Sequence, residues 1–171
     1  MISIRREEPG DFEAVHDLNL AAFEGGPEAA LVDSLRASCP DYLSLVAEDE
    51  GRVVGHILFT PVVIQSGEGD VEGVGLAPMA ILPDLQGNGI GSDLVNHGLE
   101  MLRSRSCPFV IVLGHPDYYP RFGFERASRY DLTSQWEGVP DEAFMILVLQ
   151  PGVLPAAGGV ARYRGEFDAV M

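Results

Sequence analysis

The feature that most constrains this chain is a glycine-rich turn between an apolar strand and an amphipathic helix. Leu76–Leu82 is apolar and ends at a proline, which predicts a strand. The turn, Gln86-Gly87-Asn88-Gly89-Ile90-Gly91, holds three glycines within five residues. From Ile90 onward apolar residues recur at helical spacing, at Ile90, Leu94, Val95, Leu99 and Leu102. Glycines at a helix N-terminus let backbone N–H groups approach an anion closely, so the turn predicts a phosphate site.

Two common phosphate loops do not match the turn. Ser92 stands where the third glycine of G-x-G-x-x-G would be, so a dinucleotide-binding loop is not predicted. A Walker loop needs a lysine, and all eleven basic residues of this chain are arginines. The same absence removes Schiff-base and pyridoxal-phosphate chemistry.

The remaining pattern, Gln-x-x-Gly-x-Gly at Gln86, Gly89 and Gly91, resembles the pyrophosphate loop of the GCN5-related N-acetyltransferase (GNAT) superfamily. Tyr119-Pro120-Arg121-Phe122-Gly123-Phe124 matches the family's later Tyr-x-x-x-Gly-Phe segment. The chain departs from the commoner pattern at Gly114–Asp117, Gly-His-Pro-Asp, where many members have a cofactor-binding asparagine, and in this it is similar to the bacterial YhbS-like subgroup of predicted N-acetyltransferases. Its glycine loop also lacks the basic residue that often helps to bind phosphate.

The resemblance implies acetyl-CoA as cosubstrate, with no metal. By the family pattern the binding residues are Met79, Ala80, Ile81, Gln86, Gly87, Asn88, Gly89, Ile90, Gly91 and Ser92, with Arg121 as an auxiliary phosphate contact. In the family, backbone groups of the strand at Met79–Ile81 bind the oxyanion of the tetrahedral intermediate. A glycine turn without a ligand, and a solvated Arg121, are the alternative interpretations.

Acetyl transfer to an amine needs a base for the amine proton and an acid for the departing thiolate. Tyr119 matches the family's general acid, with Tyr118 as the alternative and a packing tyrosine as the structural interpretation. His115 is the candidate base, although a structural histidine is the more common case. Glu24 and Glu28 flank the break between two predicted helices, where the resemblance implies the acceptor site; each could instead only solvate the loop.

The order of the expected strands and helices, together with the family resemblance, predicts a mixed α/β fold of the GNAT type. This fold has a mostly antiparallel sheet with helices on both faces and one parallel, splayed strand pair. Helices are expected from Asp11 to Phe23 and up to Cys39, and the parallel neighbour of Leu76–Leu82 is expected at Pro108–Leu113. Pro78 inside the key strand indicates a bulge or an edge strand. Residues 1–150 are expected to form one acetyltransferase domain, with residues 151–171 a loop-like tail that packs back on it.

Composition limits the partners. The net charge is −15, which disfavours nucleic acid, and the chain contains neither an apolar membrane span nor a signal peptide. A cytoplasmic monomer or homodimer is therefore expected. The predicted function is acetyl transfer from acetyl-CoA to a primary amine of a small molecule or peptide by direct attack in a ternary complex, and the alternative is a non-catalytic CoA-binding sensor or interaction module.

Overall fold

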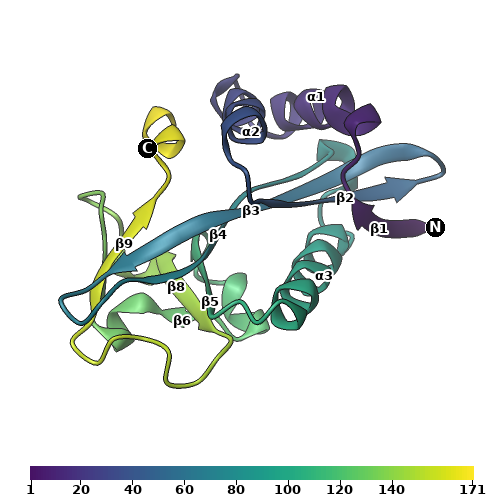
Figure 1. Ribbon diagram of the computed structural model, residues 1–171. Coiled ribbons are helices and arrows are strands. Elements are labelled where there is room, and N and C mark those ends of the chain that lie inside the picture. Colours follow the sequence, from purple (N-terminus) through teal and green to yellow (C-terminus); the bar gives the residue numbers. More distant parts are fainter. The chain divides into compact units, whose positions relative to one another are not determined.

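The computed structural model describes all 171 residues (Figure 1). Its helices are α1 (Phe12–Ala22), α2 (Pro27–Ser38) and α3 (Ile90–Ser104). Its strands are β1 (Ile2–Arg6), β2 (Leu43–Asp49), β3 (Arg52–Gln65), β4 (Val71–Ile81), β5 (Phe109–Leu113), β6 (Glu125–Arg126), β7 (Leu132–Ser134), β8 (Phe144–Val148) and β9 (Gly159–Tyr163). None of the helices combines the length and hydropathy needed to cross a membrane.

The strands form one mixed sheet with the hydrogen-bonded order β1-β2-β3-β4-β5-β8-β6, while β9 pairs with β3 and β7. The β4–β5 ladder is parallel and short, with Val74 opposite Val110 and Gly75 opposite Ile111. The predicted mixed sheet with a parallel pair is therefore confirmed, and β7–β9 adds a second parallel pair that the sequence did not reveal. Because β4 lies between β3 and β5, the alternative that Pro78 marks an edge strand is wrong for the strand as a whole. Pro78 itself lies beyond the short ladder to β5.

The chain forms two compact units, and β3 and β4 contribute residues to both. Unit 1 consists of Met1–Phe59, Ala77–Met101 and Glu166–Met171. Unit 2 consists of Thr60–Leu76 and Leu102–Gly165.

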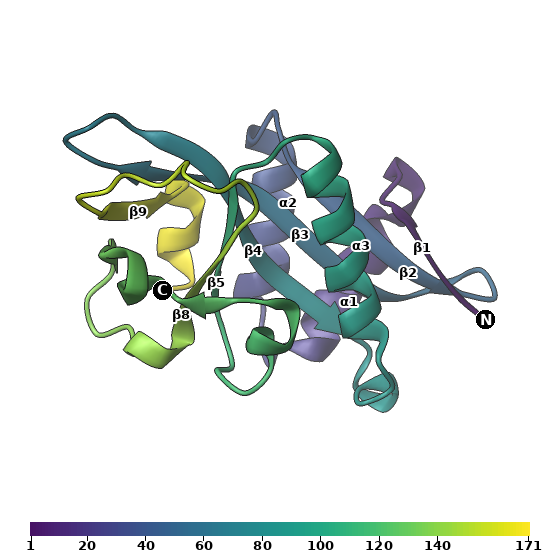
Figure 2. The same ribbon diagram turned by 90° about the horizontal axis from the view of Figure 1, so that it is seen from below.

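In unit 1, α1 and α2 lie on one face of β2 and β3, and α3 lies on the opposite face (Figures 1 and 2). Each helix buries an apolar stripe against the sheet, which is why the 3.6-residue periodicity predicted it. Along α3 this stripe is Ile90, Leu94, Val95 and Leu99. Gly98 on the same helix admits the ring of Phe59 from β3, since a Cβ at this position would collide with that ring.

In unit 2, the core is built on β5 and β8 together with the second half of β3. Val62, Ile64, Phe109, Ile111 and Ile146 are all completely buried there. Strand β9 completes this part of the sheet, since Val160–Tyr163 pair with Val62–Gln65. The prediction of a loop-like tail after Pro151 is wrong at this strand, because Gly158-Gly159 suggested only a loop.

Three polar side chains are buried between α1 and the sheet in unit 1: Asn19 on α1, Ser44 on β2 and His56 on β3. The His56 Nε2 atom lies 2.9 Å from the Ser44 hydroxyl, and its Nδ1 atom lies 3.5 Å from the Asn19 amide nitrogen. Burial, assisted by the charge of Arg36, lowers the pKa of His56 to about 3. The imidazole is therefore neutral at physiological pH.

Because His56 is buried in its neutral form, the free energy of unfolding depends on pH. In the unfolded chain the pKa of His56 is near the ordinary value of 6.5. Below that pH the imidazole is protonated in the unfolded state but remains neutral in the folded state. The free energy of unfolding should thus be unaffected by this group above pH 6.5 and should fall below it, by about 1.4 kcal/mol per pH unit.

Denaturant titrations between pH 7 and pH 4.5 measure this dependence, in a range above the ordinary value of 3.8 for the Asp11 carboxyl. A His56→Gln variant serves as control, because glutamine keeps polar atoms in the cluster but does not titrate. An equal slope in both proteins would show that His56 does not carry the effect.

Candidate active site

The glycine-rich turn opens α3 in unit 1. The Gly89 carbonyl accepts the first helical hydrogen bond, from the Asp93 N–H at 3.0 Å, so the helix is capped at Gly89. Gly87 and Gly89 have φ values of 81° and 84°, in the left-handed region that favours glycine. A Cβ built at either glycine meets no atom within 4 Å, which means that the surface above the turn is open. The N-terminus of α3, with the positive end of its helix dipole, lies at this turn.

Two polar side chains hold the turn in place. The Gln86 amide donates to the Ile81 carbonyl at the end of β4 (3.2 Å), and the Asn88 amide donates to the Leu85 carbonyl (3.0 Å). Both side chains thus bond to backbone of the strand–helix connection. In this structure they shape the loop.

The end of β4 and the start of α3 meet over Gly55 of β3. A Cβ at Gly55 would lie 3.0 Å from Ile81 and 3.1 Å from Ile90, so only glycine fits without displacement. Gly55 therefore brings Met79–Ile81 and the turn together. Gly55 was not among the residues predicted for the site. Its one signal in the sequence is a glycine inside a β-rich run, which indicates close approach of another segment.

Tyr119 lies in unit 2, at the start of a short 3₁₀ helix (Tyr119–Phe122) that follows β5. It is 7% exposed and packs edge-on against Tyr118 and Phe124, with ring centroids 5.0 and 5.6 Å away. Gly114 at the end of β5 makes room for the ring, because a Cβ there would collide with it. Burial, and to a smaller extent Tyr118, raises the pKa of Tyr119, so its hydroxyl stays protonated at neutral pH.

His115 and Arg121 lie in the same unit. His115 is exposed in the link between β5 and the 3₁₀ helix, and its carbonyl accepts the Tyr118 N–H at 3.1 Å. The Arg121 guanidinium donates to the Tyr118 carbonyl (2.9 Å) and stacks 4.5 Å from the centroid of the Tyr118 ring. Arg121 therefore supports Tyr118, and its predicted phosphate contact stays a prediction.

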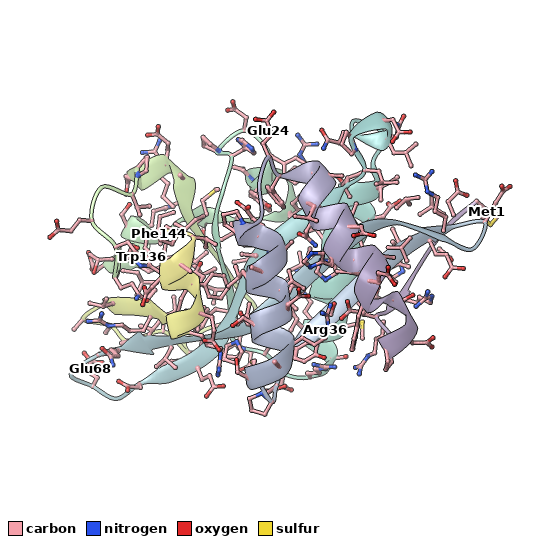
Figure 3. All side chains as sticks on the ribbon, turned by 90° about the horizontal axis from the view of Figure 1, so that it is seen from above. Met1, Glu24, Arg36, Glu68, Trp136 and Phe144 are labelled. Carbon is pink, nitrogen blue, oxygen red and sulfur yellow. The ribbon has the colours of Figure 1, made fainter.

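Glu24, which Figure 3 labels, and Glu28 lie in unit 1, where α1 leads into α2. Glu24 is exposed in the connection, and Glu28 lies in the first turn of α2. The predicted site residues are thus divided: the turn, Met79–Ile81 and the two glutamates belong to unit 1, and His115, Tyr119 and Arg121 to unit 2. No group of three or more His, Cys, Asp or Glu side chains could hold a metal ion.

Strand β4, the glycine turn that caps α3, and the 3₁₀ helix Tyr119–Phe122 after β5 are features of a CoA-dependent acyltransferase. Residues 3–127 match the family model described as "Acetyltransferase (GNAT) domain". The chain belongs to the GNAT family of acetyltransferases.

One relative, YhbS of Escherichia coli, resembles this chain over almost its whole length in both sequence and structure. This chain is 39% identical, over 166 residues, to the "Uncharacterized N-acetyltransferase YhbS" of Escherichia coli K12, and the match covers 96% of this chain and 98% of that protein. The crystal structure of E. coli YhbS in complex with CoA is similar with a TM-score of 0.89 and 36% identity, covering 98% of this chain and 92% of that one. The resemblance to the YhbS-like group is thereby confirmed.

A second similar structure comes from another organism. It is a GNAT-family acetyltransferase of Brucella melitensis in complex with acetyl-CoA, with a TM-score of 0.80 and 35% identity. The match covers 98% of this chain and 99% of that one.

Proposed function

We propose that this protein transfers the acetyl group of acetyl-CoA to a primary amine of a small molecule or peptide, by direct attack in a ternary complex. The observation that carries the proposal is the Gln-x-x-Gly-x-Gly turn that opens α3, with Gly89 at φ 84° beneath an open surface. Membership of the GNAT family supports it, as do the two similar structures that contain CoA or acetyl-CoA.

The residues of the turn fit the pyrophosphate of CoA. The backbone N–H groups from Gly87 to Ser92 provide the donors, and the N-terminus of α3 provides a positive potential. With no lysine in the chain, these backbone groups carry most of the phosphate binding. Backbone groups at Met79–Ile81 would stabilise the oxyanion that forms on the acetyl carbonyl.

In the reaction, the lone pair of the amine nitrogen forms a bond to the acetyl carbon, and the bond between that carbon and the CoA sulfur breaks. The Tyr119 hydroxyl gives its proton to the departing thiolate, which becomes the CoA thiol. The acceptor, mostly an ammonium ion at neutral pH, first loses one proton to a base, for which His115 is our candidate, and this frees the lone pair. After the attack the nitrogen loses a second proton, which restores the Tyr119 hydroxyl, so one proton is released to solvent for each acetyl group transferred. Glu24 and Glu28 attract a cationic acceptor, because a primary amine is mostly protonated at neutral pH.

Turnover of acetyl-CoA with a panel of polyamines, amino acids, aminoglycosides and peptides tests this function. We expect CoA thiol release that depends on one class of amine, with the acetylated amine identified by mass spectrometry. A reaction without amine measures background hydrolysis. Cofactor affinity with no amine-dependent thiol release would contradict the proposal and would favour a non-catalytic CoA-binding module.

A further inference from the structure

The buried group formed by Asn19, Ser44 and His56 (here the polar cluster) costs free energy that an apolar core would not. Asn19 and His56 are completely buried, and Ser44 is 6% exposed. The Asn19 Oδ1 atom has no hydrogen-bond partner in the protein. A buried amide oxygen without a partner destabilises the fold, so stability alone does not explain an asparagine here.

The proton positions in the polar cluster follow from its contacts. The Asn19 amide nitrogen donates one hydrogen to the Val15 carbonyl (2.9 Å), and its second hydrogen is directed at His56 Nδ1 (3.5 Å). Because an amide nitrogen only donates, Nδ1 must accept and is unprotonated. The neutral ring therefore carries its proton on Nε2, which donates to the Ser44 hydroxyl at 2.9 Å.

This proton assignment excludes a second catalytic site. A serine, a histidine and an asparagine in sequence resemble a nucleophilic triad, in which the histidine accepts the serine proton. Here Nε2 already holds a proton, so it cannot accept one from Ser44. The Ser44 hydroxyl is also too well buried for a substrate to reach.

Asn19 connects the polar cluster to the loop between α1 and α2. Its side chain is held by Val15 and His56, and its own carbonyl accepts the Phe23 N–H at 3.1 Å. Phe23 is the C-cap of α1, with extended backbone (φ −115°, ψ 123°), and Glu24 follows directly. Gly25 (φ 129°) and Gly26 have little intrinsic stiffness. The position of Glu24 therefore depends on where α1 ends.

We propose that Asn19, held by the neutral His56, is a positioning residue: it fixes where α1 ends and thereby presents Glu24 to the acceptor amine. This inference rests on the proposed function, in which the α1–α2 loop binds the acceptor. It adds that acceptor binding depends on a buried hydrogen bond to β3 beneath the loop.

An Asn19→Leu variant tests the proposal, because leucine keeps the volume and removes the amide. We expect amide hydrogen exchange of the Phe23 N–H, whose acceptor is the Asn19 carbonyl, to rise about fivefold or more, equivalent to about 1 kcal/mol, while exchange in α2 and β2 stays unchanged. With the best amine of the panel, KM for the amine should rise by a similar factor. The kcat and the KM for acetyl-CoA should stay within about twofold of the wild type.

Val15→Ala is the matched control. Val15 is completely buried on the same helix, and its side chain lies outside the polar cluster. This variant should loosen α1 as a whole without an amine-selective rise in KM. If it reproduced the Asn19→Leu pattern, a general loss of helix packing would explain the result and the proposal would be overturned.

Two further measurements keep the test independent of the acceptor. Nitrogen NMR should show the neutral His56 ring protonated on Nε2, and a proton on Nδ1 would overturn the inferred contacts. If no amine were acetylated, the proposed function would fail by itself. Exchange of the Phe23 N–H would then still decide whether Asn19 fixes the end of α1, and wild-type exchange in Asn19→Leu would reject that role.

Discussion

A Gly89→Asp variant is expected to lose CoA binding while it keeps its fold. Gly89 has φ 84° and open space where a Cβ would stand, and aspartate is among the residues that tolerate this backbone region. Its carboxylate would point toward the proposed pyrophosphate site. Two unit charges 4 Å apart repel by about 4 kcal/mol near a protein surface, which corresponds to about a thousandfold in affinity. Isothermal titration with CoA measures the loss.

Two matched variants separate charge from shape. Gly89→Asn is isosteric with the aspartate and uncharged, so it should weaken CoA binding far less. Gly69→Asp places the same substitution at another open glycine with positive φ (112°), in the β3–β4 turn, and should leave the affinity unchanged. Wild-type affinity in Gly89→Asp would show that the turn does not bind the phosphates.

The glycine turn and α3 were predictable because their signals are local. A short apolar run, three glycines and a helical stripe from Ile90 each follow from backbone geometry within a few residues. The same locality explains the successful prediction of α1 and β5. A motif of this kind also identifies the family, because it specifies both a backbone conformation and a ligand.

Features made by contacts distant in the sequence were not predictable in this way. Strand β9 exists because it pairs with Val62–Gln65, almost a hundred residues earlier. Its own sequence begins with a glycine that follows another, Gly158, and shows little alternation. The polar cluster joins Asn19, Ser44 and His56 from three elements. In the sequence, Asn19 is simply a polar residue in a helix, and His56 is one of four histidines.

In the candidate site, the contacts of single side chains were also not predictable from the sequence. The motif selected Gln86 and Asn88 for the cofactor, and this stays a prediction. In the structure their amides bond to the Ile81 and Leu85 carbonyls, which the motif did not predict. Arg121 likewise stacks on Tyr118. A sequence motif identifies the loop, but the direction of an exposed polar side chain depends on which carbonyls the folded backbone leaves within reach.

Replacing Tyr119 by phenylalanine should reduce turnover by about 10²- to 10⁴-fold, the usual effect of losing a general acid. The phenylalanine ring retains the edge-on contacts to Tyr118 and Phe124 and still fills the space beside Gly114. The hydroxyl is the only group removed. Burial raises the pKa of Tyr119, so in the wild type this hydroxyl carries a transferable proton throughout the neutral range.

The melting temperature and the affinity for CoA separate this role from packing. If Tyr119 is the general acid, both stay close to wild type while kcat falls. If the hydroxyl only bonds within the fold, its loss costs about 1 kcal/mol of stability and leaves kcat intact. Tyr118→Phe is the matched control, since the two rings are neighbours 5.0 Å apart. Full activity in Tyr119→Phe with a large loss in Tyr118→Phe would move the role to Tyr118, and full activity in both would reject a tyrosine acid.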